Sequence, residues 1–178
     1  MNTLIRLALT AGAVILFAGT LSGCGHDAAS GRESRPPTAS IPTPIRSPES
    51  AAILRVLTAD GKIAPSNINL EAPARDYVTF VVGRMRSLTL EGCPDDFRAA
   101  YQAHIAAWQR MLRTTIDHSN EVKTVKAWND ILVLHGMEPR NDLEREFFAA
   151  SAEIKSTFEV CTEIADRYRI RQSEYDPD

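Results

Sequence analysis

Apolar side chains recur every three or four residues over two long stretches of the chain, and this spacing constrains the fold more than any other feature. Over about 94–117 the stripe consists of Phe97, Tyr101, His104, Trp108, Met111 and Thr115. Over about 139–168 it consists of Leu143, Phe147, Ala150, Ile154, Phe158, Cys161, Ala165 and Tyr168. One face of an α-helix has this period, so both stretches are predicted to be long amphipathic helices.

Start signals support the first of these helices. Pro94 suits the first helical position, and Asp95 and Asp96 interact favourably with the helix dipole in the first turn. Their charges therefore have a structural explanation and need no catalytic one.

Shorter helices are predicted on either side. One covers about 122–135, with Ser119 or Asn120 as its cap and Gly136 and Pro139 as its stop. Another covers 74–88, and a third begins at Ser47 and ends near residue 61, followed by a loop over 62–71. No segment shows sustained alternation with period two. We therefore expect an all-α fold, a small helical bundle of three long helices plus one or two short ones.

Composition divides the chain into four parts. Residues 1–23 have the charged start, apolar run and small residues of a secretory signal, and the apolar run is too short to span a membrane. Residues 24–47 are rich in Pro, Ser and Thr and poor in large apolar side chains, which predicts a disordered tether. Residues 48–172 suffice for a single helical domain, and 173–178 are expected to be a flexible tail.

The end of the signal carries the sequence Leu21-Ser22-Gly23-Cys24. This resembles the lipobox of bacterial lipoproteins, and the resemblance implies that Cys24 is acylated and becomes the first mature residue. Stable anchoring requires more than one acyl chain. Because Gly25 and not Asp follows the cysteine, the resemblance implies an outer-membrane location facing the periplasm if the host has two membranes.

The mature chain is mildly acidic. With Arg6 removed, 19 basic residues remain against 23 acidic ones. Nucleic-acid-binding modules concentrate Lys and Arg, so this composition argues against nucleic acid as a partner.

Cys93 and Cys161 remain once Cys24 is assigned to the lipid. In an exported protein these two can form one intramolecular disulfide, with a pair of buried free thiols as the alternative. Cys93 lies at the start of one long helix and Cys161 far along the other, so a bridge requires the two helices to run antiparallel and residues 118–138 to cross between them. Such a bridge would stabilise the fold by roughly 4 kcal/mol in the chain-entropy model.

Candidate chemistry is sparse. Tyr101, His104 and Trp108 share one helix face and could line a ligand or haem pocket, although a histidine on an apolar stripe is usually packed. His118 and His135 lie near predicted helix ends, where an interaction with terminal carbonyls explains them. The chain has no haem-attachment, nucleophile-elbow, zinc-protease, phosphate-loop or calcium-loop motif. We therefore expect no catalytic residues, no metal and no cofactor.

The segment from Cys93 to Trp108 has the pattern C-P-x-x-F-x-x-A-Y-x-x-H-x-x-A-W. It resembles a pattern in small uncharacterised exported helical proteins of bacteria, a likeness that implies a fold without an activity. From these features we expect a non-enzymatic, lipid-anchored envelope protein that binds another protein or supports an envelope assembly. The alternatives are a helical carrier or sensor of a small ligand and, third, a cell-envelope enzyme.

Overall fold

The computed structural model describes residues 46–63, 69–134 and 137–175. Within these ranges the chain is helical and forms no strand, so the predicted all-α class is confirmed. The helices are α2 (Pro48–Asp60), α3 (Ala74–Arg86), α4 (Asp95–Asp117), α5 (Val125–Leu132), α6 (Asp142–Arg167) and α7 (Gln172–Tyr175). The signal, Cys24, most of the predicted tether and His135 lie outside the described residues.

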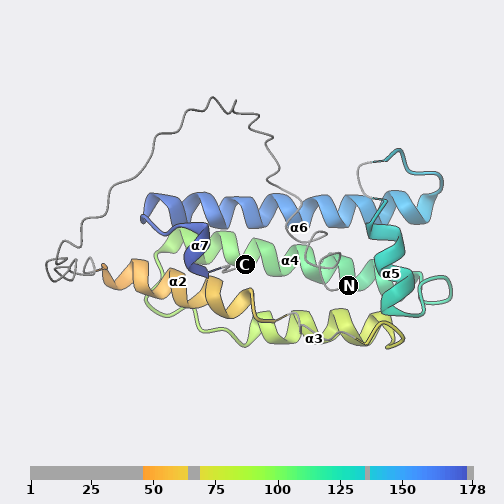
Figure 1. The fold of residues 1–178 in the computed structure, drawn as a ribbon, viewed down its shortest axis with the longest axis horizontal. Helices are drawn as coiled ribbons and strands as arrows, with labels where there is room; N and C mark the ends of the chain where they lie inside the picture. Colours follow the sequence, from red (N-terminus) through yellow and green to blue (C-terminus); the bar gives the residue numbers. More distant parts are fainter. Residues whose placement is uncertain (1–45, 64–68, 135–136, 176–178) are drawn as a thin grey trace, which may run out of the picture.

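The two long helices, α4 and α6, lie side by side and run antiparallel (Figure 1). Contacts between them fix the register along their whole length. Asp96 pairs with Arg167 at 2.9 Å, Arg110 pairs with Glu153 at 2.7 Å, and His118 at the end of α4 lies 2.8 Å from Glu146 near the start of α6. For residues of α4 and α6 that face each other, the two residue numbers therefore add up to about the same value along the whole contact.

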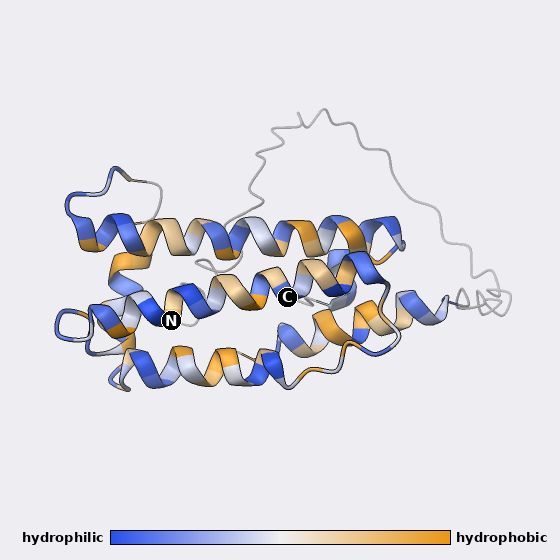
Figure 2. Cartoon of the chain, turned by 180° about the vertical axis from the view of Figure 1, so that it is seen from behind, coloured by the Kyte–Doolittle hydropathy of each residue, from blue (hydrophilic) through white to orange (hydrophobic). Residues whose placement is uncertain are grey.

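A third layer is shared by two helices of 13 residues each, α2 and α3, which lie end to end along the α4–α6 pair (Figure 1). Orange and blue alternate around the helices in Figure 2, as expected for amphipathic elements. Each layer contributes fully buried side chains to one core, the largest being Tyr101, Phe97, Phe147, Ile53, Leu57, Met85 and Met111. The helices predicted from Ser47 to about residue 61 and over 74–88 are thus present as α2 and α3, beside the two long helices α4 and α6.

Helix α5 crosses the end of the bundle and does not run along it (Figure 1). The strand-like pairing of residues 72–74 with 123–125 fixes its start: the Ala74 amide donates to the Lys123 carbonyl at 3.1 Å, and the Val125 amide donates to the Ala72 carbonyl at 2.9 Å. The crossing expected for 118–138 is therefore present.

Two predicted helix starts are wrong by a few residues because other caps compete. Thr124, and neither Ser119 nor Asn120, caps α5, with its hydroxyl accepting the Ala127 amide at 3.2 Å. Asn141 caps α6 by accepting the Glu144 amide at 2.8 Å, so this helix begins after Pro139. A side-chain oxygen that satisfies a free amide sets the helix boundary.

The end of the described chain is ordered, in contrast to the expected flexible tail over 173–178. Tyr175 is buried in α7, and α7 packs against α2. Glu174 pairs with Arg46, while the Ser50 hydroxyl donates to the Tyr168 carbonyl at 3.1 Å. Residues 176–178 lie outside the described part.

Cys93 and Cys161 are free, buried thiols, so the expected disulfide is not formed in the structure. The helices run antiparallel as a bridge requires, but the α4–α6 register places Cys161 level with Tyr101. This is eight residues beyond Cys93, or about 12 Å along a helix axis, whereas bridged cysteines have Cα atoms within about 7 Å. The alternative of two free thiols describes the structure.

No helix in the described ranges is both long enough and apolar enough to cross a membrane.

We predict that the core depends on Phe97 far more than on Phe80. Phe97 is fully buried in α4, whereas Phe80 on α3 is 48% exposed. Phe97→Ala should lower the free energy of unfolding by about 3–5 kcal/mol because it leaves a cavity, and Phe80→Ala by about 1 kcal/mol or less. Urea denaturation measures both losses, and equal losses would contradict this packing.

Candidate functional site

Helix α4 brings the three predicted pocket residues to one face. Tyr101, His104 and Trp108 are all buried. The Tyr101 and His104 rings lie 6.1 Å apart between centroids, and Trp108 follows one helical turn later. The sequence prediction that they share a stripe is correct, but this stripe faces the packed interior.

His104 is held by side chains of α6. Its Nδ1 lies 3.0 Å from the Thr157 Oγ1, and its ring lies 5.3 Å from that of Phe158. The Thr157 hydroxyl donates to carbonyl oxygens of its own helix, at 2.7 Å for Glu153, so its oxygen accepts from an Nδ1–H of the imidazole. Burial lowers the pKa of His104 to about 4, which keeps the ring neutral at physiological pH.

A second polar group meets Tyr101 from α2. The Tyr101 hydroxyl donates to the Asp60 Oδ1 at 2.5 Å, across 41 residues of sequence. Burial raises the pKa of the Asp60 carboxyl group to about 6, against the smaller lowering effect of the Tyr101 hydrogen bond. Burial, together with this carboxyl group, also raises the pKa of Tyr101 above its usual range.

Cys161 of α6 completes a polar cluster that we define as Asp60, Tyr101, His104 and Cys161, in which Asp60 is half-buried and the other three are buried. Burial, followed by the nearby Asp60, raises the pKa of Cys161 to about 12. Burial likewise raises the pKa of Cys93. Both thiols are therefore kept protonated and are poor nucleophiles.

Sequence reasoning missed Asp60. An Asp at the end of a helix and before Gly61 has the pattern of a solvent-exposed residue. Its partner lies on another helix, and no local periodicity indicates that contact. The only available indication was the Tyr101 hydroxyl, since a buried tyrosine usually finds a hydrogen-bond partner.

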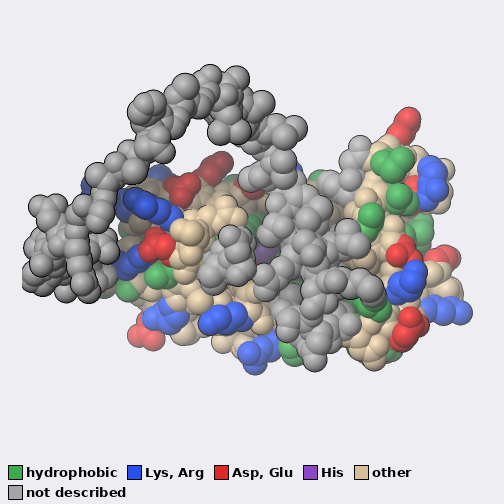
Figure 3. Space-filling view, in the orientation of Figure 1, with side chains coloured by type: hydrophobic (Ala, Val, Ile, Leu, Met, Phe, Trp, Pro, Cys, Tyr) green, Lys and Arg blue, Asp and Glu red, His purple; other side chains and the backbone are tan. Residues whose placement is uncertain are grey.

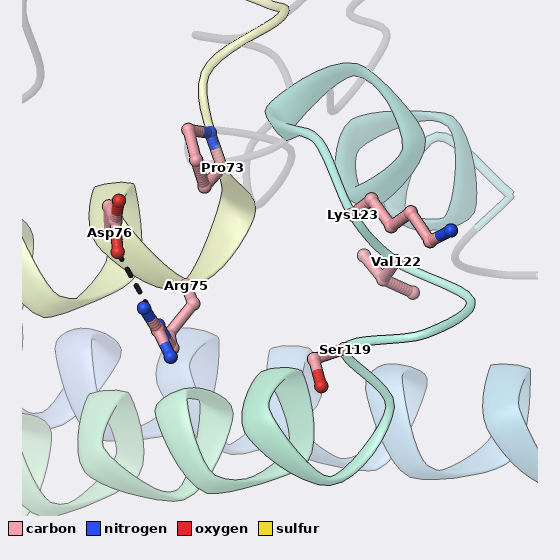
Figure 4. Close-up of a pocket in the computed structure, with 6 residues that line it drawn as sticks. All are labelled: Pro73, Arg75, Asp76, Ser119, Val122 and Lys123. Atoms are coloured by element: carbon pink, nitrogen blue, oxygen red, sulfur yellow. Dashed lines mark hydrogen bonds and ion pairs between the residues drawn. The ribbon is translucent and has the colours of Figure 1, made fainter.

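A shallow cavity of about 200 Å³ lies elsewhere, between the start of α3 and the α4–α5 connection (Figure 4). Its lining consists of Pro73, Arg75, Asp76, Ser119, Val122 and Lys123. Arg75 and Asp76 pair with each other at 3.4 Å, and both are exposed. The cavity thus includes none of the three residues predicted to line a ligand pocket.

The remaining histidine predictions concern helix ends. His118 follows the last residue of α4, and its Nε2 lies 2.8 Å from the Glu146 Oε2 while its ring lies 6.1 Å from that of Phe147. The side chain therefore joins the end of α4 to the first turns of α6. Within the described ranges, no cluster of three or more His, Cys, Asp or Glu residues could hold a metal ion.

No protein-family model, curated protein or solved structure matches this chain.

We predict that His104 makes the protein sensitive to acid. Because the folded-state pKa of His104 is about 4 and the ordinary pKa of a histidine is 6.5, the unfolded chain binds the proton more readily, and stability falls as the pH drops from 6.5 towards 4. Between pH 7 and 5, the unfolding free energy should fall by about 2 kcal/mol more in the wild type than in His104→Asn.

Chemical denaturation at a series of pH values checks this expectation, with Gln102→Asn on the exposed face of α4 as the control. His104→Asn shifts stability by a constant amount through altered packing, so only the pH-dependent difference counts. Parallel profiles for His104→Asn and the wild type would show that His104 does not titrate as expected.

Proposed function

We propose that this protein is a lipid-anchored component of the bacterial cell envelope whose helical bundle binds another protein. The lipobox pattern at Cys24 and the Pro-rich segment after it support the anchor. The arrangement of the bundle supports a binding surface at the end that is remote from the anchor.

The chain enters the bundle at Arg46, beside the start of α2, at one end of the molecule (Figure 1). Helix α5 and the start of α6 lie at the opposite end (Figure 1). A bundle attached through residues before Arg46 therefore presents the α5 end away from its attachment.

The observation that carries the proposal is the exposure of Val133 and Met137 at this remote end. Their side chains are 54% and 65% exposed, the highest values among the large exposed hydrophobic residues of the described part. Half-buried Ile131 and Leu134 lie beside them in sequence. Hydrophobic side chains are visible over this end in the space-filling view (Figure 3). We call Val133 and Met137, with these two neighbours, the distal apolar surface.

Charges around the distal apolar surface indicate what kind of partner fits. Residues 117–146 contain four Lys or Arg and seven Asp or Glu. The basic side chains are largely neutralised by local pairs, such as Lys126 with Asp130 and Arg140 with Glu144. Glu121 and Glu138 form no ion pair within the described part of the chain.

This acidic excess favours a protein partner that presents apolar residues bordered by Lys and Arg, because opposite potentials steer association and suppress wrong partners. It disfavours insertion into an anionic lipid surface, which attracts basic segments. The distal apolar surface is therefore proposed to bind a basic, apolar patch of an envelope protein.

We predict that Cys24→Ser releases the protein from the membrane. Without the thiol no acyl chain can be attached, and the apolar run of residues 1–23 is too short to span a membrane. Fractionation of bacteria that express each form, together with incorporation of a labelled fatty acid, measures the anchor. Serine substitution at Cys93 is the control, and a Cys24→Ser protein that stays in the membrane fraction would contradict the anchor.

We predict that a photo-crosslinking amino acid at position 137 captures a partner and that one at position 160 does not. Val160 is a matched control, since it is 45% exposed on α6 but lies away from the distal apolar surface. The crosslinked partner peptides should contain Lys or Arg beside apolar residues, and the yield should fall at high salt.

Each outcome of the crosslinking decides something. Adducts from position 160 alone would move the binding surface elsewhere and leave the function in place. Adducts that contain only this chain would indicate self-association and contradict a heterologous partner. No adduct from 137, 160 or a third position at Phe80 would overturn the binding function itself.

A further inference from the structure

The outward face of α3 carries a ridge of large side chains. This helix lies along one edge of the bundle and packs inward on α4 and α5 (Figure 1). Asp76, Phe80 and Arg84 follow each other at intervals of four residues and are all exposed, so they form one row along the helix. Phe80, in the middle, is 48% exposed. The ridge is thus acidic at one end, apolar at its centre and basic at the other end.

A row of small residues lies beside this ridge. It consists of Thr79, Gly83 and Ser87, which have the same spacing and are also exposed. A Cβ added to Gly83 would meet no neighbouring atom of the described chain within 4 Å, and the φ of Gly83 is not positive. Neither packing nor backbone conformation in the described chain therefore requires a glycine here, where it lowers helix stability relative to alanine. The glycine leaves room for the close approach of another chain.

We propose that α3 is a dimerisation surface, at which two copies of this chain pack antiparallel with the ridge of each copy in the small-residue row of the other. Ridges of this spacing commonly pack into the grooves of a facing helix. When the pairing is centred between residues 80 and 83, Phe80 of each copy lies over Gly83 of the other. The inference goes beyond the binding function proposed above and depends on neither the lipid anchor nor the envelope partner.

The charges of the ridge favour a second copy in this orientation. In an antiparallel pair, Asp76 of each copy lies within about one helical turn of Arg84 of the other, so opposite charges meet twice. A parallel pair would instead place each of these charges beside its own kind. Arg84 forms no ion pair in the described part of the chain, and Asp76 makes only an exposed contact of 3.4 Å with Arg75. Arg86 lies on the far side of the small-residue row, away from the ridge.

The length of α3 limits the strength of this dimer. Each copy contributes one face of a helix of 13 residues, which is about 20 Å long. A standard protein interface buries about 1,600 Å² in total, and one helix face on another buries less. The dimer is therefore expected to be weak and to dissociate on dilution.

The test is sedimentation equilibrium of the full-length protein in a density-matched detergent, with micelles in excess over protein. We expect the mass to rise from one copy to two as the protein concentration increases. Gly83→Gln fills the place of Phe80 of the other copy and should lower the association constant at least about tenfold. The control is Ala152→Gln, which introduces the same side chain at an exposed position of α6 and should leave the association constant unchanged.

The stability of the monomer separates a lost contact from a damaged fold. At a concentration where the protein is monomeric, Gly83→Gln should unfold at the same urea concentration as the wild type or a higher one. The reason is that glutamine favours a helix more than glycine does, and nothing in the described chain obstructs a side chain here.

Reversal of the ridge charges tests the antiparallel pairing itself. Asp76→Arg and Arg84→Asp should each lower the association constant about tenfold, because like charges then face each other, and the double variant should restore it. Within one chain these two residues are eight positions apart, or about 12 Å along the helix axis. Restoration in the double variant therefore reports a contact between copies.

A protein that stays monomeric over the whole concentration range would overturn the dimer. A dimer that Gly83→Gln leaves intact would rule out α3 as its surface, and a double variant that associates no better than the single ones would rule out the antiparallel pairing. These outcomes are distinct from those of the crosslinking at position 137, which reports on a different element of the structure.

Discussion

The antiparallel contact between α4 and α6 is the constraint on which the rest of the structure depends. Its register is repeated at four levels, from Asp96 with Arg167 to His118 with Glu146, and the buried faces of both helices meet along this length. The surface ion pairs add little stability by themselves. The buried apolar stripe supplies the stability, and the two half-length helices, α2 and α3, complete the core by covering one side of the pair.

Much of this architecture could be predicted from the sequence because it follows from local periodicity. The spacing of Phe97, Tyr101, His104 and Trp108 identified α4 within one residue of its bounds, and similar spacing identified α6. Helix starts were less predictable because side-chain caps decide them. The α6 helix begins after its cap Asn141 and not at Pro139. The α5 helix is capped by Thr124 and by neither Ser119 nor Asn120. α7 was missed because four residues are too few for a periodic pattern.

Long-range contacts were beyond the reach of sequence reasoning, and the polar features of the molecule depend on them. From the sequence, Cys93 and Cys161 could form a disulfide or remain two free thiols. Only the register of α4 against α6 decides between these alternatives. Likewise the hydrogen bond of Asp60 comes from Tyr101, a residue 41 positions away on another helix. His104 was correctly identified as a residue of the apolar stripe, but the Thr157 hydroxyl with which it forms a hydrogen bond belongs to α6.

The ties between the two ends of the described chain have a mechanical consequence. Arg46 pairs with Glu174, and Ser50 binds the carbonyl of Tyr168, so the point at which the chain enters the bundle is fastened sideways to the C-terminal segment. A force applied through the residues before Arg46 acts on α2 and the C-terminal segment together. The start of α2 and the C-terminal segment, which are remote in sequence, then bear the force together. Detachment of α2 requires the loss of its contacts with the C-terminal segment as well as those with the core.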